Sequence, residues 1–210
     1  MTAAEPPRSD LVRGAIWLEW LTAAWMLVEA AVAIGSGVSA RSLSLIAFGA
    51  DSLIELASAA VVLWPLNLEM RQGREFPASV EQRAGRIGGA LLLALAAYVV
   101  ASAAYGLWRQ QGQEFSKPGF VLTVLAIPIM LALAKAKIHV ADQIGSPALR
   151  ADAVESIACA YLAGVVMLGL LAQLLAGWWW VDSITSLAIV VLLVKEGREA
   201  WHGGEREAAG

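Results

Sequence analysis

The chain has 210 residues, of which 59% are hydrophobic, and its formal net charge is −3. Its mean hydropathy is +0.65, and its apolar runs repeatedly reach the roughly 20 residues needed to cross a hydrocarbon core. These properties exclude a soluble globular protein, and the single cysteine, Cys159, excludes an internal disulfide bond. We therefore expect an all-α integral membrane protein.

Six apolar stretches are predicted to be transmembrane helices, at 15–34, 43–63, 87–108, 120–136, 153–175 and 178–194. Six spans place both termini on one side, where twelve of the lysines and arginines then fall, against three on the other side. The excess of positive charge predicts that both termini are cytoplasmic. We expect one six-helix transmembrane domain at 14–200, with short cytoplasmic tails at 1–13 and 201–210.

The first predicted span contains two glutamates. Glu19 lies about one turn from the cytoplasmic end, where we expect it to snorkel or to pair with Arg13. Glu29 lies deeper in the predicted span. Its position is consistent with a hydrogen-bonded structural role, with a contact that supports the ligands of a metal ion, or with a place on a proton path. A short outer turn is expected at 35–37, where two glycines flank a serine.

The second predicted span carries Asp51 and Glu55, which are one helical turn apart and therefore share a face. A charged side chain near the bilayer centre costs about 2.5–3.5 kcal/mol on insertion scales. We interpret the pair as a cation-binding site. The alternative is a packing role, with the carboxylates protonated or bonded to neighbouring helices. Pro65 is expected to end this helix.

The third and fourth predicted spans contain few candidate functional residues. The third span has no ionisable residue and is rich in alanine and glycine, which indicates a scaffold or dimer-contact helix. The fourth span is expected to end at Ala136, so that an inner loop carries Lys135, Lys137, His139 and Asp142. His139 is interpreted as a solvated loop residue.

The fifth span begins with a polar stripe in an otherwise apolar helix. Asp152, Glu155 and Cys159 fall, together with a serine, within an arc of about 100°. Glu155 and Cys159 reach the depth of the second-span carboxylates, so all four can meet near the midplane. Cys159 alone is compatible with a small buried apolar residue or a metal ligand.

Two further aspartates lie near the ends of predicted helices. Asp152 is close to the cytoplasm, where a helix-start role or pairing with Arg150 competes with a place on the ion path. Asp182 begins the sixth span and is expected first to cap that helix, with a place on the proton path as the alternative.

Three segments together resemble the cation diffusion facilitator family: Gly-Ala-Asp-Ser-Leu-Ile-Glu at 49–55, Leu-Arg-Ala-Asp at 149–152, and Asp-Ser-Ile-Thr-Ser-Leu-Ala…Lys-Glu-Gly across 182–197. The resemblance covers nearly the whole chain, and six spans with cytoplasmic termini match it. It implies a transporter rather than an enzyme, exporting a divalent metal ion, usually zinc, in exchange for protons, as a homodimer.

The resemblance also implies a ligand set. Two acidic residues of the second span, here Asp51 and Glu55, are joined in the family by a histidine and an aspartate of the fifth span, whose positions hold Glu155 and Cys159 here. The family's histidine-containing inner loop and its soluble C-terminal domain have no counterpart, so the sequence is interpreted as a divergent member lacking the C-terminal cytoplasmic domain.

The chemistry of these four residues bears on which metal is bound and on the role of Glu155. A cysteine thiolate favours Zn²⁺ over Mg²⁺ or Mn²⁺. Four deprotonated ligands would leave a charge of −2 after binding a dication, so we expect Glu155 to be either the fourth ligand or the proton acceptor. Zinc is then the transported substrate rather than a cofactor, and the other partners are protons, membrane lipid and a second copy of the chain, with no nucleic acid.

The sequence also bears on two functions other than transport. The main alternative is a non-transporting membrane protein that acts as an interaction or regulatory subunit. An intramembrane enzyme is disfavoured, because Cys159 has no histidine within reach to act as its base. The plasma membrane of a bacterial-type cell, its inner membrane, is the expected location.

Overall fold

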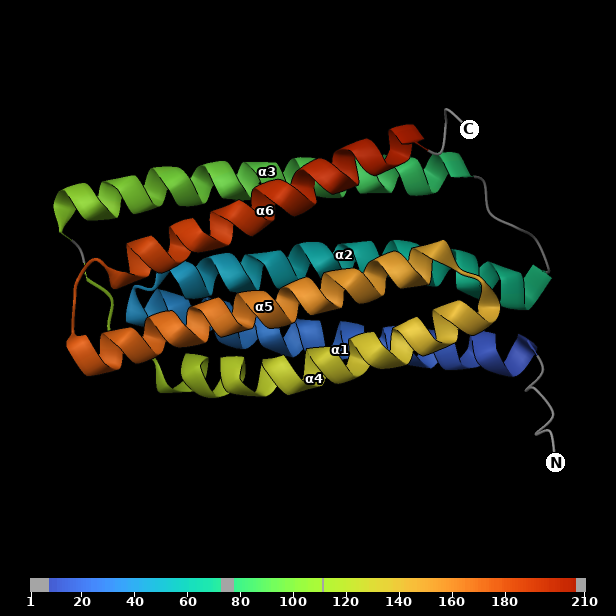
Figure 1. Cartoon of the computed structure of the whole chain (residues 1–210), viewed down its shortest axis with the longest axis horizontal. Helices are drawn as coiled ribbons and strands as arrows, with labels where there is room; N and C mark the ends of the chain where they lie inside the picture. Colours follow the sequence, from blue (N-terminus) through green and yellow to red (C-terminus); the bar gives the residue numbers. More distant parts are fainter. Residues whose placement is uncertain (1–7, 73–77, 111, 207–210) are drawn as a thin grey trace.

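Figure 1 shows a bundle of long helices that lie side by side. The structure is a computed structural model that describes residues 8–72, 78–110 and 112–206, without every side chain in these ranges. The helices are α1 (Arg8–Ala40), α2 (Leu43–Gln72), α3 (Ala78–Arg109), α4 (Lys117–Ile144), α5 (Pro147–Ala176) and α6 (Val181–Arg206). This confirms the predicted all-α fold with six helices. The start of α1 and the end of α6 lie at the same end of the bundle (Figure 1).

The packing of the helices places α2 at the centre. It packs against α1 and α3 and also contacts α5 and α6, while α4 packs against α1 and α5, and α3 against α6. The main core contains Phe48 of α2, Met130 of α4 and Leu162 of α5, all fully buried. Side chains on the inner face of α2 are therefore shielded on several sides.

The outer surface and the helix lengths are those of an integral membrane protein. Within the described residues, four helices contain stretches long and apolar enough to cross a membrane: Asp10–Ala40, Gly89–Arg109, Lys117–Ile144 and Asp152–Ala176. Large apolar side chains such as Leu91, Leu168 and Val191 are exposed on the outside of the bundle. Such a surface suits contact with lipid tails and would be unfavourable in water.

The predicted outer turn at 35–37 is wrong, because α1 continues through these residues to Ala40. The chain reverses at Arg41, which has a left-handed backbone with φ of 55°. Gly37 serves helix packing instead of a turn. A Cβ atom there would lie 2.8 Å from Ile46 Cγ1, so only glycine allows α1 and α2 to approach this closely.

The predicted inner loop after Ala136 is also wrong. Helix α4 runs on to Ile144 and ends at Gly145, whose φ of 67° allows its N–H to bond Ala141 O. The next helix begins at once, because Ser146 caps α5 by accepting a hydrogen bond from Leu149 N, with a proline in the first turn. Residues 135–142 therefore belong to a helix whose inward face is buried.

Helix ends elsewhere also extend beyond the predicted spans. Helix α1 begins at Arg8, inside the stretch predicted as a tail, and α6 ends at Arg206. Helix α2 continues through Pro65 to Gln72 instead of ending there. Proline is tolerated within transmembrane helices when neighbouring groups satisfy the freed backbone carbonyl.

Candidate cation site

The two carboxylates of α2 predicted as a cation site both lie inside the bundle. Asp51 is 0% exposed and Glu55 is 6% exposed. Both oxygens of Asp51, and Oε2 of Glu55, accept no hydrogen bond from the described residues. A buried carboxylate without a partner is costly at low dielectric, so this pair requires protons or a cation for charge compensation.

Beside this pair, Glu29 links three helices through hydrogen bonds. Its Oε2 accepts from Trp25 Nε1 at 2.9 Å, and its Oε1 accepts from Ser52 Oγ at 2.7 Å. The same Oε1 accepts from Cys159 Sγ of α5 at 3.3 Å. Because Ser52 follows Asp51 on α2, this hydrogen-bonded group adjoins the pair of α2 carboxylates. Glu29 is thus hydrogen-bonded, while its part in a proton path stays a prediction.

The sulfur of Cys159 is fully buried and close to acidic groups. The charges of Glu55, Glu29 and Asp51 all act on it. Among the described residues, however, no three Asp, Glu, His or Cys side chains lie close enough together to hold a metal ion. The predicted ligands are therefore neighbours that do not form a closed coordination shell in this conformation, and their assignment stays a prediction.

Two half-buried glutamates extend the acidic region toward the inner ends of α5 and α6. The charge of Glu155 acts on both Asp51 and Glu55, and so does that of Glu196 on α6. Glu196 lies beyond the span predicted to end at Val194. Burial, and next the charge of Glu199, raise the pKa of Glu196 to about 7, while Lys195 acts in the opposite direction.

Asp182 has a different role from the one predicted, because its carboxylate caps α2 and not its own helix. It accepts hydrogen bonds from the hydroxyl groups of Ser42 at 2.9 Å and Ser44 at 2.6 Å, and from the backbone N–H groups of Leu43 at 2.6 Å and Ser44 at 3.2 Å. The first free N–H groups of α2 are thus satisfied from α6. Asp182 fixes where α2 begins, eight residues before Asp51.

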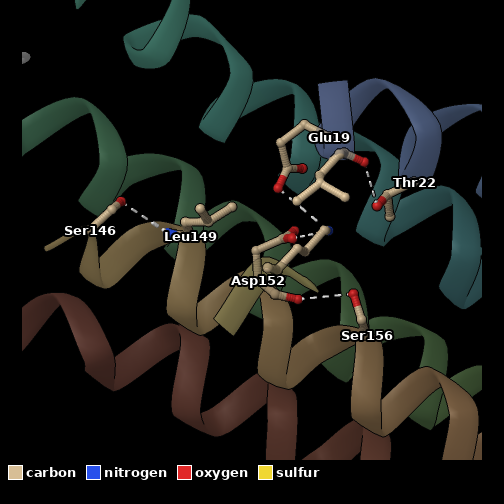
Figure 2. A network of polar contacts seen from close by, with 8 residues as sticks. Glu19, Thr22, Ser146, Leu149, Asp152 and Ser156 are labelled. Atoms are coloured by element: carbon tan, nitrogen blue, oxygen red, sulfur yellow. Dashed lines mark hydrogen bonds and ion pairs between the residues drawn. The ribbon is translucent and has the colours of Figure 1, made fainter. Parts of the chain in front are cut away.

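A second buried cluster of charges joins α1, α4 and α5 (Figure 2). Lys137 of α4 is 0% exposed and forms an ion pair with Asp152 Oδ2. Its Nζ also lies 3.4 Å from Oε1 of Glu19, which is fully buried. The predicted pairs of Glu19 with Arg13 and of Asp152 with Arg150 are therefore wrong. Arg150 instead forms an exposed ion pair with Asp142.

Lys137 and Glu196 are functional candidates that the sequence interpretation did not identify. The sequence predicts a loop at Lys137, where a lysine is ordinary. A signal for burial exists in the helical spacing, because Met130, Leu133, Lys137, Ala141 and Ile144 recur at intervals of three or four and all are buried. Extending the fourth helix past Ala136 would have placed Lys137 on this inward face.

The helical bundle, with a buried carboxylate pair of which three oxygens accept no hydrogen bond from the described residues, defines a membrane protein with a candidate cation site. Residues 20–201 match the cation efflux transmembrane domain. The chain therefore belongs to the cation efflux family, whose members are transporters and not enzymes, and the membership implies cation transport. No significant match was found among curated proteins.

Proposed function

We propose that the protein exports a divalent metal ion, with zinc as the first candidate, from the cytoplasm in exchange for protons. The observation that carries this proposal is the pair of buried α2 carboxylates with three oxygens that lack a hydrogen-bond partner among the described residues. Transport alternates access to this pair between the two membrane faces. The proposed setting is a homodimer in the plasma membrane, or inner membrane, of a bacterial-type cell, with both termini cytoplasmic.

The proposed ligands are Asp51, Glu55 and Cys159, with Glu155 as the fourth ligand or the proton acceptor. Two carboxylates neutralise a dication, and a thiolate at about 2.3 Å selects zinc over the all-oxygen preferences of Mg²⁺ and Mn²⁺. A fully deprotonated set would carry −4, so one acidic group remains protonated or outside the shell. Metal binding therefore releases protons from the same groups that bind metal, which is the coupling an antiporter needs.

Loading the site requires a rearrangement of the thiol. Cys159 donates its S–H to Glu29 Oε1 at 3.3 Å, and a thiol must lose this proton before it can bind zinc. Glu29 accepts that hydrogen bond and is therefore the neighbouring group on the proposed proton path. A movement of α5 relative to α2 would then bring the sulfur and the carboxylates into one coordination shell.

The test is zinc uptake into inside-out proteoliposomes under an imposed proton gradient. We expect gradient-dependent uptake by the wild type, its loss in Asp51→Asn, and strongly reduced uptake in Cys159→Ser. Asp142→Asn is the matched control, because Asp142 forms an exposed ion pair at the end of the bundle, and it should transport normally. Absence of flux for zinc, cadmium, cobalt, iron and manganese would contradict transport and favour a non-transporting membrane subunit.

A further inference from the structure

The cluster of Glu19, Lys137 and Asp152 has an unbalanced charge. If all three groups were ionised, the two carboxylates and one ammonium would sum to −1. Glu19 and Lys137 are fully buried and Asp152 is 4% exposed. A net charge enclosed in a low-dielectric interior is unfavourable, so the cluster requires one more positive charge.

The geometry shows which carboxylate remains uncompensated. Asp152 is the closer partner of Lys137 and forms a direct hydrogen-bonded ion pair with it. Glu19 Oε1 lies at 3.4 Å from the same ammonium, and neither oxygen of Glu19 accepts a hydrogen bond from the described residues. Figure 2 shows the side chains of Glu19 and Asp152 close to one another within this cluster.

The charged groups around this carboxylate are few. Asp152 from α5 and Lys137 from α4 act on Glu19, and these two also act on Glu155. Helix α2, which packs against α1, contributes Asp51 and Glu55 among its described side chains. The hydrogen bond between Ser52 and Glu29 places these two residues at the same height along the bundle axis. Glu55 lies three residues from Ser52 in the direction of Glu19. At a rise of 1.5 Å per residue on both helices, about 10 Å along the axis then separates Glu55 from Glu19. Among the described side chains of these helices, Lys137 is the cation that acts on Glu19.

We propose that Glu19 is a proton-binding site, separate from the α2 carboxylates and completed by the Lys137–Asp152 ion pair. With the proton on Glu19, the cluster is neutral and α1, α4 and α5 are held together at this end of the bundle. When the proton leaves, two carboxylates share one ammonium. This site does not depend on which cation the protein carries or on whether it carries one.

Infrared spectroscopy of the full chain in lipid, without added metal, tests the proposal through the C=O stretch of protonated carboxyl groups at neutral pH. We expect Glu19→Gln to fold and to lose one protonated-carboxyl contribution relative to the wild type. Asp152→Asn should lose the same contribution, because Lys137 then pairs with Glu19 and keeps it ionised. Lys137→Met should gain one, because Asp152 then lacks its cation.

Asp142→Asn, which alters an exposed ion pair at the same end of α4 and α5, should leave the spectrum unchanged. An unchanged protonated-carboxyl band in both Glu19→Gln and Asp152→Asn would overturn the proposal, since Glu19 would then be ionised in the wild type. If Glu19→Gln does not fold, Asp152→Asn decides alone. Because no metal flux is measured, failure of the transport proposal leaves this result intact.

Discussion

The carboxylate of Asp182 fixes the start of a helix other than its own, through four hydrogen bonds to residues 42–44. Replacing it by alanine removes the cap and leaves buried donors without an acceptor, so we expect a loss of about 2 kcal/mol or more in stability. Zinc affinity of the folded protein should change little, because Asp51 lies two turns away. Thermal unfolding and zinc binding, measured together, check this, and reduced affinity at unchanged stability would contradict the structural role.

Glu196 leads to a pH-dependent prediction. Its pKa is raised to about 7, first by burial and then by Glu199, so it is ionised above neutral pH and protonated below. Its negative charge acts on Asp51 and would attract a bound dication. We expect Glu196→Gln to weaken zinc binding about threefold or more at pH 8, because Coulomb interactions are strong at low dielectric, and to have little effect at pH 6.

Isothermal titration at the two pH values measures this difference. Glu199→Gln is the comparison variant, because it removes a charge from an exposed neighbour of Glu196. That variant lowers the pKa of Glu196 and should keep Glu196 ionised to lower pH. An equal effect of Glu196→Gln at pH 6 and pH 8 would contradict the assignment.

The contact between α1 and α2 depends on glycine in the motif that carries the carboxylates. A Cβ atom on Gly49 would lie 2.8 Å from Ile34 Cγ1 and 3.0 Å from Ala33 Cβ, so the helices would have to separate. Gly49→Ala should therefore destabilise the protein by about 1–3 kcal/mol and reduce transport by displacing Asp51. Gly35→Ala is the matched control, because nothing lies within 4 Å of its added methyl group, and helix propensity should make it neutral or stabilising.

Thermal stability and zinc uptake of the two alanine variants distinguish the effect of close helix packing from the effect of helix propensity. If Gly49→Ala is as stable and active as Gly35→Ala, then close approach of α1 and α2 is not needed at this position. The same pair of measurements shows whether the α2 carboxylates depend on the neighbouring helix for their placement.

The number and order of the helices could be predicted because long apolar runs are a strong local signal. Helix ends could not, since they depend on tertiary contacts: glycines at 35–37 look like a turn until Ile46 is seen against Gly37. The buried pair Asp51 and Glu55 could be predicted from spacing alone. The partners of Glu19 could not, because Lys137 is more than a hundred residues away and its burial depends on how α1, α4 and α5 pack.

The bundle as a whole has the start of α1 and the end of α6 at one end (Figure 1). With the excess of lysine and arginine on that side, we predict that this end faces the cytoplasm. A membrane-impermeant thiol reagent should label cysteines introduced singly at Asp10 or Trp201, in a Cys159→Ser background, only in inside-out vesicles. A cysteine at Arg109 should be labelled only in right-side-out vesicles. Labelling of positions 10 and 201 from opposite sides would contradict an even number of spans.

The most direct test of the central claim is equilibrium binding of radioactive zinc to the purified protein at several pH values. We predict saturable binding that strengthens as pH rises, because protons compete for the same carboxylates. Asp51→Asn should lower the affinity at least tenfold, or about 1.4 kcal/mol, while Asp142→Asn binds as the wild type does. Zinc binding that is unchanged in Asp51→Asn would contradict the assignment of the α2 carboxylates as the cation site.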